Sequence, residues 1–301
     1  MRPRHETPNV PAAPALAYVV DIGGSHVTAA VVERGRRPRV IDRSSSAIDT
    51  HGDGDSLITA IGDTLLPFAT NARAWTIALP GPFDYARGIG TFEGVEKFSG
   101  LANLDLRASL STILGVDEGA ITFINDAIAY GIGEWDVSEA RPDRFICVTL
   151  GTGIGSAFLD RGQPVEEGRE VPPHGWAHLL RFDGAPLEDA VSTRAIQRRY
   201  GELTGRSLEV RAIAERARTG EEHARAVLEA AMFELGGVLA PWVDSFHATE
   251  LVVGGSMARS WDVLGTAFVR GITSSTAARV AVRASALLDD APLVGAAVHT
   301  S

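Results

Sequence analysis

Two glycine-rich turns, each set between apolar runs, constrain the fold of this chain more than any other feature. The first, Asp21-Ile22-Gly23-Gly24-Ser25, separates the apolar runs 17–20 and 27–32. The second, Leu150-Gly151-Thr152-Gly153-Ile154-Gly155, has the same kind of flanks. Apolar and β-branched residues favour strands, and glycine tolerates the positive φ values of a tight turn. Each segment therefore predicts a strand, a turn and a second strand.

Glycine turns of this kind can bring backbone N–H groups close to an anion. One such turn is weak evidence, but two of them about half a chain apart indicate a duplicated cleft for a nucleotide. A third loop, at the end of the apolar run 251–253, suits close contact with an adenine or a ribose, although alone it is a common strand-to-helix turn. The candidate nucleotide contacts are Gly23, Gly24, Ser25, Gly151, Thr152, Gly153, Gly254 and Gly255.

Composition excludes several classes of protein. A length of 301 residues suits two domains or one large one, and the net charge of −10 argues against a nucleic-acid surface. We expect no membrane partner, because no apolar run approaches the roughly 18 residues that span a bilayer. Cys147 is the only cysteine, which excludes internal disulfides and a cysteine-based zinc cluster. Residues 1–15 are predicted to form a disordered tail rather than a secretory signal, and the protein is expected to be cytoplasmic.

Hydrophobic periodicity predicts a mixed α/β order that occurs twice. Asp53 or Asp55 is the expected N-cap of the first helix, Pro241 is expected to kink or break a long helix, and 83–103 is expected to be a binding loop or lid. A hinge is expected at 140–143. The order argues against a simple dinucleotide-binding fold. Strands are predicted at 17–20, 26–32, 39–41, 75–79, 121–124, 145–148, 157–159 and 251–253, and helices at 55–68, 105–114, 125–134, 192–201, 208–218, 221–240, 256–270 and 292–298.

Asp21 lies where a strand enters the first turn. A carboxylate there can hold Mg²⁺, usually through water, beside phosphates bound by the turn. The alternative is that Asp21 only stabilises its own turn, which is the usual role of an isolated aspartate in this context. The presence of the second turn favours the metal-binding role.

Asn125 and Asp126 lie between a predicted strand and a predicted helix. An aspartate at such a junction most often caps the helix. The functional alternative is a general base, because phosphoryl transfer to an alcohol needs a carboxylate within reach of the attacking hydroxyl. Asn125 could bind a neighbouring hydroxyl. The segment 168–196 adds His174, His178 and Glu188, whose mixed donors and acceptors suit a polyhydroxylated ligand better than a metal.

The order of these motifs resembles the ROK family of bacterial sugar kinases and related repressors, over roughly residues 17 to 299. The resemblance implies the two-lobed actin-like ATPase (ribonuclease H-like) fold, ATP with Mg²⁺ and a homodimer. It assigns the catalytic base to Asp126 and makes Gly81, Asn125, His178 and Glu188 candidate sugar contacts. The segments that carry it are Asp21-Ile22-Gly23-Gly24-Ser25, Leu79-Pro80-Gly81-Pro82-Phe83-Asp84, Asn125-Asp126-Ala127 through Gly133-Glu134, Leu150-Gly151-Thr152-Gly153-Ile154-Gly155, Val253-Gly254-Gly255 and Asp289-Asp290-Ala291-Pro292-Leu293-Val294-Gly295-Ala296-Ala297. The expected lobes are 16–136 with 290–301, and 137–289.

The chain departs from the family pattern in two places. The family's Gly-Glu-x-Gly-His segment corresponds to His174-Gly175-Trp176-Ala177-His178, so the histidine is kept and Gly175 replaces the sugar-binding glutamate. The cysteines of the family's zinc site are missing from 182–186, and we therefore predict no structural zinc. The missing glutamate points to an altered polyol, such as an amino sugar or a C7-cyclitol of secondary metabolism.

Two classes of function follow from the resemblance. The first is an ATP-dependent, glucokinase-like enzyme that phosphorylates a primary hydroxyl of a hexose or a sugar-like polyol. The second is a non-catalytic sugar sensor, because the family includes repressors. Those carry an N-terminal winged-helix domain, for which the first predicted strand, near residue 17, leaves no room. Retention of Asp126 and of both turns favours the kinase.

Overall fold

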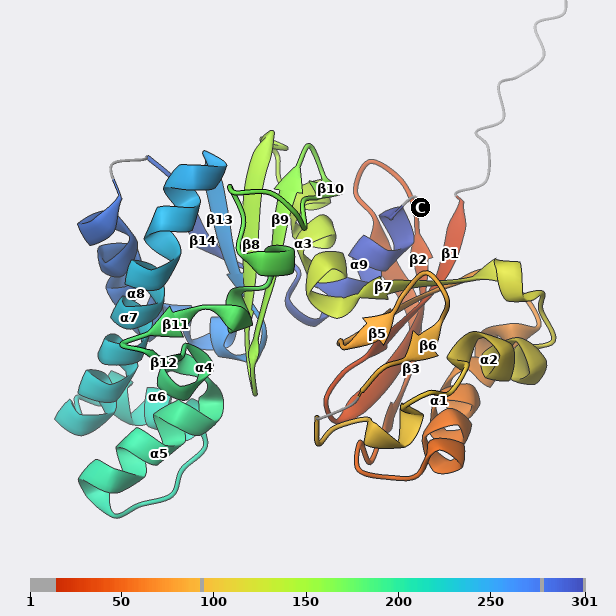
Figure 1. The fold of residues 1–301 in the computed structure, drawn as a ribbon, viewed down its shortest axis with the longest axis horizontal. Coiled ribbons are helices and arrows are strands. Elements are labelled where there is room, and N and C mark those ends of the chain that lie inside the picture. Colours follow the sequence, from red (N-terminus) through yellow and green to blue (C-terminus); the bar gives the residue numbers. More distant parts are fainter. Residues whose placement is uncertain (1–14, 93–94, 277–278, 300–301) are drawn as a thin grey trace, which may run out of the picture.

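Two five-stranded sheets with the same strand order form the framework of the protein (Figure 1). The computed structural model describes residues 15–92, 95–276 and 279–299. The tail predicted at 1–15 therefore lies almost wholly outside the described residues. Each sheet has three antiparallel strands, consecutive in the chain, on one side, and two strands on the other that run parallel to the first of the three. This repeat confirms the predicted internal duplication.

The first sheet is built around the first glycine turn. Its order is β3 (Arg39–Ala47), β2 (His26–Glu33), β1 (Leu16–Ile22), β4 (Trp75–Leu79) and β7 (Ile121–Asn125). Helices α1 (Gly54–Ala69) and α2 (Leu106–Leu114) pack against one face, where Leu57, Ile61 and Leu110 join the core. The Asp53 carboxylate accepts a hydrogen bond from Ser56 N at 2.8 Å, so Asp53 is the N-cap. A small hairpin of β5 (Phe83–Asp84) and β6 (Ile89–Gly90) lies within the segment expected to be irregular.

The second sheet repeats this plan around the second turn. Its order is β10 (Gln163–Pro164), β9 (Ile154–Asp160), β8 (Arg144–Leu150), β13 (Glu250–Gly254) and β14 (Ala281–Ala284). The helices of this half share one buried apolar cluster with it. They are α4 (Glu188–Val191), α5 (Thr193–Thr204), α6 (Val210–Arg218), α7 (Glu222–Phe246) and α8 (Trp261–Ser275), with a short hairpin of β11 (Arg181–Phe182) and β12 (Ala185–Pro186).

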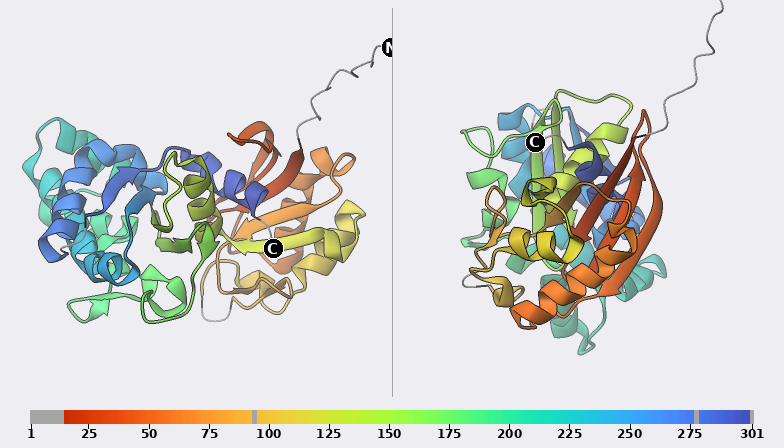
Figure 2. Two further views of the ribbon diagram at one scale, coloured as in Figure 1. Left: turned by 90° about the horizontal axis from the view of Figure 1, so that it is seen from above. Right: turned by 90° about the vertical axis from the view of Figure 1, so that its right-hand side faces the viewer.

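Helices α3 (Asp126–Val137) and α9 (Ala291–Val298) lie between the two sheets (Figures 1 and 2). The buried side of α3 packs against β8 and β9, and α9 packs against β1 and β2. The two helices approach so closely that a Cβ on Gly295 would lie 1.7 Å from the Ala129 carbonyl oxygen. Glycine is therefore needed at this crossing, where the two lobes meet.

Two helices bear on the predictions made from the sequence. The helix expected to continue past Pro241 with a kink or a break does continue, without a break, to Phe246, and buried residues on both sides of the proline, Leu239 and Val243, hold it in the core. The helix expected at 256–270 begins as a 3₁₀ segment, Ser256–Ser260, and becomes α-helical only from Trp261. The preceding residue, Gly255, has a φ of +77° and lies outside the helix, and the Ala258 N–H donates to its carbonyl at 3.1 Å in a 3₁₀ pattern.

The longest helix also differs from expectation in its hydropathy. By length and composition α7 could cross a membrane, whereas no such run was expected. Half of its most apolar window is buried inside the second lobe, where Leu228, Leu235 and Leu239 pack into the core. A core helix of a globular domain meets the same two criteria.

Candidate active site

Asp21 and Asp126 lie at the same edge of the first sheet. Strands β1, β4 and β7 are adjacent and parallel, and they end at Asp21-Ile22, Leu79 and Asn125. Their carboxyl ends therefore open onto one region, which is where open α/β sheets bind ligands. The Pro80-Gly81 turn follows β4 directly and lies in the same region.

Asn125, and not Asp126, is the N-cap of α3. Asn125 Oδ1 accepts hydrogen bonds from Ala127 N at 3.0 Å and Ile128 N at 3.1 Å. Capping by Asn125 removes the commonest structural role from Asp126, which is the first residue of the helix. The Asp126 carboxylate accepts a hydrogen bond from Ala127 N at 2.8 Å, and Asp126 lies at the carboxyl edge of the sheet, directly after β7.

Tyr85 is a site residue that sequence reasoning missed. Asn125 Nδ2 donates to Tyr85 Oη at 3.0 Å, and Tyr85 donates in turn to the Leu79 carbonyl at 3.2 Å. A Cβ on Gly81 would lie 3.5 Å from the same hydroxyl. Tyr85, Asn125 and Gly81 therefore form one polar cluster beside Asp126. The only signal in the sequence was the position of Tyr85 inside the expected binding loop.

The two aspartates have strongly perturbed acidities. Burial raises the pKa of Asp126 to about 6, although the backbone N–H of Ala127 stabilises the carboxylate. Burial, followed by the charges of Asp126 and Asp289, raises the pKa of Asp21 to about 7. A carboxylate with a pKa near 6 is a better proton acceptor near neutral pH than an ordinary aspartate.

The donor set around Asp21 fits Mg²⁺. Carboxylate oxygens are hard ligands, and a divalent cation would relieve the repulsion that Asp126 and Asp289 exert on the Asp21 carboxylate. Within the described residues no group of three or more His, Cys, Asp or Glu side chains is arranged to hold a metal ion. Mg²⁺ commonly binds through one or two carboxylates together with water and substrate phosphates.

The second turn is fixed by Glu188. Glu188 Oε1 accepts a hydrogen bond from Ile154 N at 2.7 Å, and Thr193 N donates to the Gly151 carbonyl at 3.0 Å. A Cβ on Gly153 would lie 2.5 Å from the same carboxylate oxygen. Glu188 was expected to contact the sugar, but the structure places one of its oxygens on the turn backbone.

The two glycine-rich segments of the second lobe adjoin each other and α3. A Cβ on Gly255 would lie 2.4 Å from the Leu150 carbonyl, and one on Gly254 would lie 2.3 Å from the Tyr130 ring. A Cβ on Gly155 would lie 2.7 Å from that of Ala127, the residue after Asp126. The structure thus brings the predicted nucleotide loops of the second lobe against the helix that begins with Asp126.

The segment that departs from the family pattern brings three aromatic rings together, with Trp176 stacked on His178 and tilted against His174. Trp176 lies between His174 and His178, with ring centroids 4.9 Å and 5.4 Å apart. Burial lowers the pKa of His178, and the nearby Glu188 charge partly offsets this effect. Gly175 has a φ of +69°, and a Cβ there would lie 3.1 Å from the Val165 carbonyl. A side chain at position 175 is therefore disfavoured by both backbone and space.

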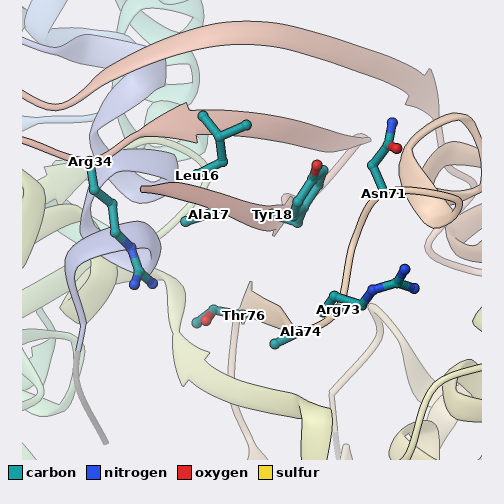
Figure 3. Close-up of a pocket in the computed structure, with 8 residues that line it drawn as sticks. All are labelled: Leu16, Ala17, Tyr18, Arg34, Asn71, Arg73, Ala74 and Thr76. Carbon is teal, nitrogen blue, oxygen red and sulfur yellow. The ribbon is translucent and has the colours of Figure 1, made fainter. Parts of the chain in front are cut away.

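A surface hollow lies away from this region. It has a volume of about 400 Å³ and is drawn in Figure 3. It is lined by Leu16, Ala17, Tyr18, Arg34, Asn71, Arg73, Ala74 and Thr76. These residues surround the amino ends of β1 and β4, whereas the turns and Asp126 lie at the carboxyl ends. The hollow takes no part in the site described above.

Comparisons with known proteins agree with the fold. The model of the ROK family matches residues 17–300. A glucokinase from Thermotoga maritima is 25% identical over 92% of this chain and 95% of its own length. A solved ROK family glucokinase from Streptomyces griseus, in complex with glucose and AMPPNP, superposes with a TM-score of 0.76 at 22% identity, covering 94% and 98% of the two chains. A ROK family transcriptional regulator superposes with a TM-score of 0.77 at 19% identity, covering 94% of this chain and 76% of its own. These likenesses establish the two-lobed actin-like ATPase fold.

Proposed function

The chain belongs to the ROK family, and we propose that it is an ATP-dependent kinase that phosphorylates a primary hydroxyl of a hexose or sugar-like polyol. One observation carries the proposal. Asp126 is released from helix capping by Asn125 and has a pKa raised to about 6. Its charge acts on Asp21 of the first turn, and the next residue, Ala127, lies against Gly155 of the second turn. A general base for phosphoryl transfer needs this combination of position and basicity.

In the proposed reaction, Asp126 accepts the proton of the acceptor hydroxyl as its oxygen attacks the γ-phosphorus. A new O–P bond forms, and the bond from phosphorus to the bridging oxygen of ADP breaks, so that the electron pair leaves with ADP. Asn125 and Tyr85, already joined by a hydrogen bond, orient the acceptor beside the base. Backbone amides of the turns at 23–25 and 151–153 bind the phosphates, and Gly254-Gly255 contacts the nucleoside.

Asp21 would hold Mg²⁺, through water, next to the phosphates. The ion would neutralise charge that develops on the phosphoryl group. It would also offset burial and the charges of Asp126 and Asp289, which together raise the pKa of Asp21. We further propose that the protein is a cytoplasmic homodimer with the lobes 16–136 plus 290–301 and 137–289.

The acceptor is where this chain differs from a glucokinase. Gly175 supplies no carboxylate, and its positive φ disfavours one. The loss of one hydrogen-bonding group favours an acceptor with a changed hydroxyl pattern, such as a C7-cyclitol or an amino sugar. The neighbouring rings of Trp176, His174 and His178 can contact an acyl group or the C–H face of a ring.

A non-catalytic sugar sensor is the second candidate. It is favoured by the replacement at Gly175 and by the likeness to a transcriptional regulator. The intact cluster of Asp126, Asn125 and Tyr85 supports catalysis instead.

Coupled measurement of ADP release separates these possibilities. The purified protein is given MgATP with a panel of hexoses, N-acetylhexosamines and cyclitols. We expect turnover with at least one acceptor, and the preferred class identifies the substrate. Measurable binding of a sugar by calorimetry without ADP release from any acceptor would support the sensor and contradict the kinase.

A further inference from the structure

Lys97 is the only lysine among the 28 lysine and arginine residues of the chain, and it lies against the first glycine turn. A Cβ built on Gly24 would lie 2.7 Å from Lys97 Nζ and 3.9 Å from Lys97 Cε. The ammonium group therefore occupies the space that the missing side chain of Gly24 leaves open. The other 27 residues of this group are arginines, so this is the one position at which the chain has a lysine in place of an arginine.

The groups around this ammonium are free to bind a ligand. Among the described residues, no ion pair or hydrogen bond involves Lys97 Nζ, and the side chain is only partly buried. In the same part of the chain, no hydrogen bond uses the backbone N–H of Gly24 or Ser25, which are both exposed. An ammonium group beside successive unpaired amides is a suitable site for a phosphate.

The position of Lys97 relative to the turn is fixed by one shared segment. Ile48 N donates to the Ser25 carbonyl at 3.0 Å, which holds the turn to the end of β3. Phe98 N donates to the Thr50 carbonyl at 2.7 Å, which holds the neighbour of Lys97 to the residues that follow β3. The Phe98 side chain is buried and packs on Phe92 with ring centroids 5.6 Å apart. Lys97 is thus carried by a well-anchored turn.

We propose that Lys97 Nζ binds the terminal phosphoryl group of the phosphate donor and stabilises its charge during transfer, together with the amides of Gly24 and Ser25. The proposal rests on the proposed kinase function and adds a catalytic residue to it. Asp21, in the same turn, supplies a carboxylate and no positive charge, whereas Lys97 brings a side-chain cation to this turn. A compact ammonium group suits a single phosphate oxygen, whereas a guanidinium group prefers bidentate contacts. The ligand that Lys97 would bind is a polyphosphate chain, which either a nucleoside triphosphate or inorganic polyphosphate can supply.

The single lysine makes a direct chemical test possible. Partial reductive methylation labels only two amines, Lys97 Nζ and the α-amino group of the chain, and peptide mass spectrometry measures each separately. We expect saturating MgATP to slow labelling of Lys97 at least fivefold, with MgADP giving much weaker protection and the α-amine unchanged. Protection by tripolyphosphate in the absence of nucleotide would show that the polyphosphate chain suffices for binding at Lys97, and formation of phosphorylated acceptor from tripolyphosphate would identify inorganic polyphosphate as a donor.

Two outcomes contradict the proposal in different ways. If calorimetry shows that MgATP binds but Lys97 labelling is unchanged, the Lys97 assignment is wrong and the kinase proposal stands. If neither MgATP nor tripolyphosphate binds, both proposals fail.

Variants give an independent readout. Lys97→Ala should lower kcat for the acceptor reaction about 10- to 100-fold with little change in the acceptor KM, and Lys97→Arg should recover part of the loss. Arg37→Ala removes one positive charge from the exposed turn at the opposite end of the β2–β3 hairpin and should leave kcat unchanged. An equal effect of Arg37→Ala and Lys97→Ala would show that only net charge matters and would overturn the assignment.

Discussion

The carboxylates of Asp21 and Asp126 lie at the ends of β1 and β7 and interact electrostatically across the intervening strand β4. Each is raised in pKa by burial, and Asp126 further raises the pKa of Asp21. In a protein without a bound cation this arrangement costs stability, because both groups ionise in a poorly solvated place. We interpret the cost as the consequence of placing a base and a metal ligand side by side.

The first prediction concerns stability against pH. The folded-state pKa of Asp21 is raised from 3.8 to about 7, so the folded state favours the protonated form. The contribution of Asp21 to the free energy of unfolding is most favourable below about pH 3.8, where the group is protonated in both states. This contribution is lost as the pH rises through about 7. Asp21→Asn removes this loss, and we expect it to stabilise the metal-free protein at pH 8 by about 2 kcal/mol, with almost no effect at pH 4.

Urea unfolding without Mg²⁺ at the two pH values measures this difference. Asp63→Asn is a control, because Asp63 is an exposed carboxylate on α1. Equal stabilisation by Asp21→Asn at both pH values would contradict the ionisation argument.

A second prediction distinguishes two roles for Glu188. If its main role is to hold the second turn through Ile154 N, then Glu188→Ala raises the KM for ATP about tenfold. Glu188→Gln keeps an oxygen acceptor at the same position and should restore most of the affinity. Steady-state kinetics with both substrates varied gives the answer. A rise in the acceptor KM alone would assign Glu188 to the sugar instead.

The third prediction concerns the buried carboxylate of Glu134 on α3. It accepts hydrogen bonds from Arg283 at 2.7 Å, Ser285 at 2.6 Å and Leu287 N at 2.8 Å, and its side chain is fully buried. Removal of Glu134 leaves the Ser285 hydroxyl and the N–H groups of Ala286 and Leu287 without this acceptor, although Glu250 still pairs with Arg283. Glu134→Ala should therefore destabilise the protein by about 2 to 4 kcal/mol.

The exposed pair of Glu215 and Arg218 provides the matched control. Its glutamate side chain is 63% exposed, and Glu215→Ala should cost less than about 0.5 kcal/mol. Chemical denaturation of the two variants measures both values. Comparable losses would show that the Glu134 network does not link α3 to β14 as the structure indicates.

The fourth prediction is that the protein binds no structural zinc. It rests on the sequence, which has one cysteine, Cys147, buried in the strand β8. Elemental analysis of protein purified without chelator should find zinc far below one equivalent. A stoichiometric amount would show that the site uses ligands other than cysteine.

Local sequence patterns predicted much of the fold. Both hairpins, the strand β4 and the capping of α1 follow from apolar patterns, glycine turns and Asp53. The short strand β14 was missed, because Ala281–Ala284 forms a strand only by pairing with β13. The continuation of α7 through Pro241 also depends on tertiary packing, which outweighs the local preference of proline.

Site residues could be predicted where they belong to a local sequence pattern. Asp126 and the glycine turns are recognisable because each lies at a strand end. Tyr85 and Lys97 were not, because their contacts with Asn125 and Gly24 join residues from different elements. Likewise, the hydrogen bond from Ile154 N to Glu188 spans 34 residues and has no local signature.

The central claim is that Asp126 is the general base of a phosphoryl transfer. The most direct test is ADP release with the best acceptor, with the wild type compared with Asp126→Ala at pH 7.5 and with binding of both substrates checked by calorimetry. We predict that Asp126→Ala binds MgATP and the acceptor but turns over at least about 100-fold more slowly. Turnover that survives unchanged in Asp126→Ala would contradict the assignment of the base.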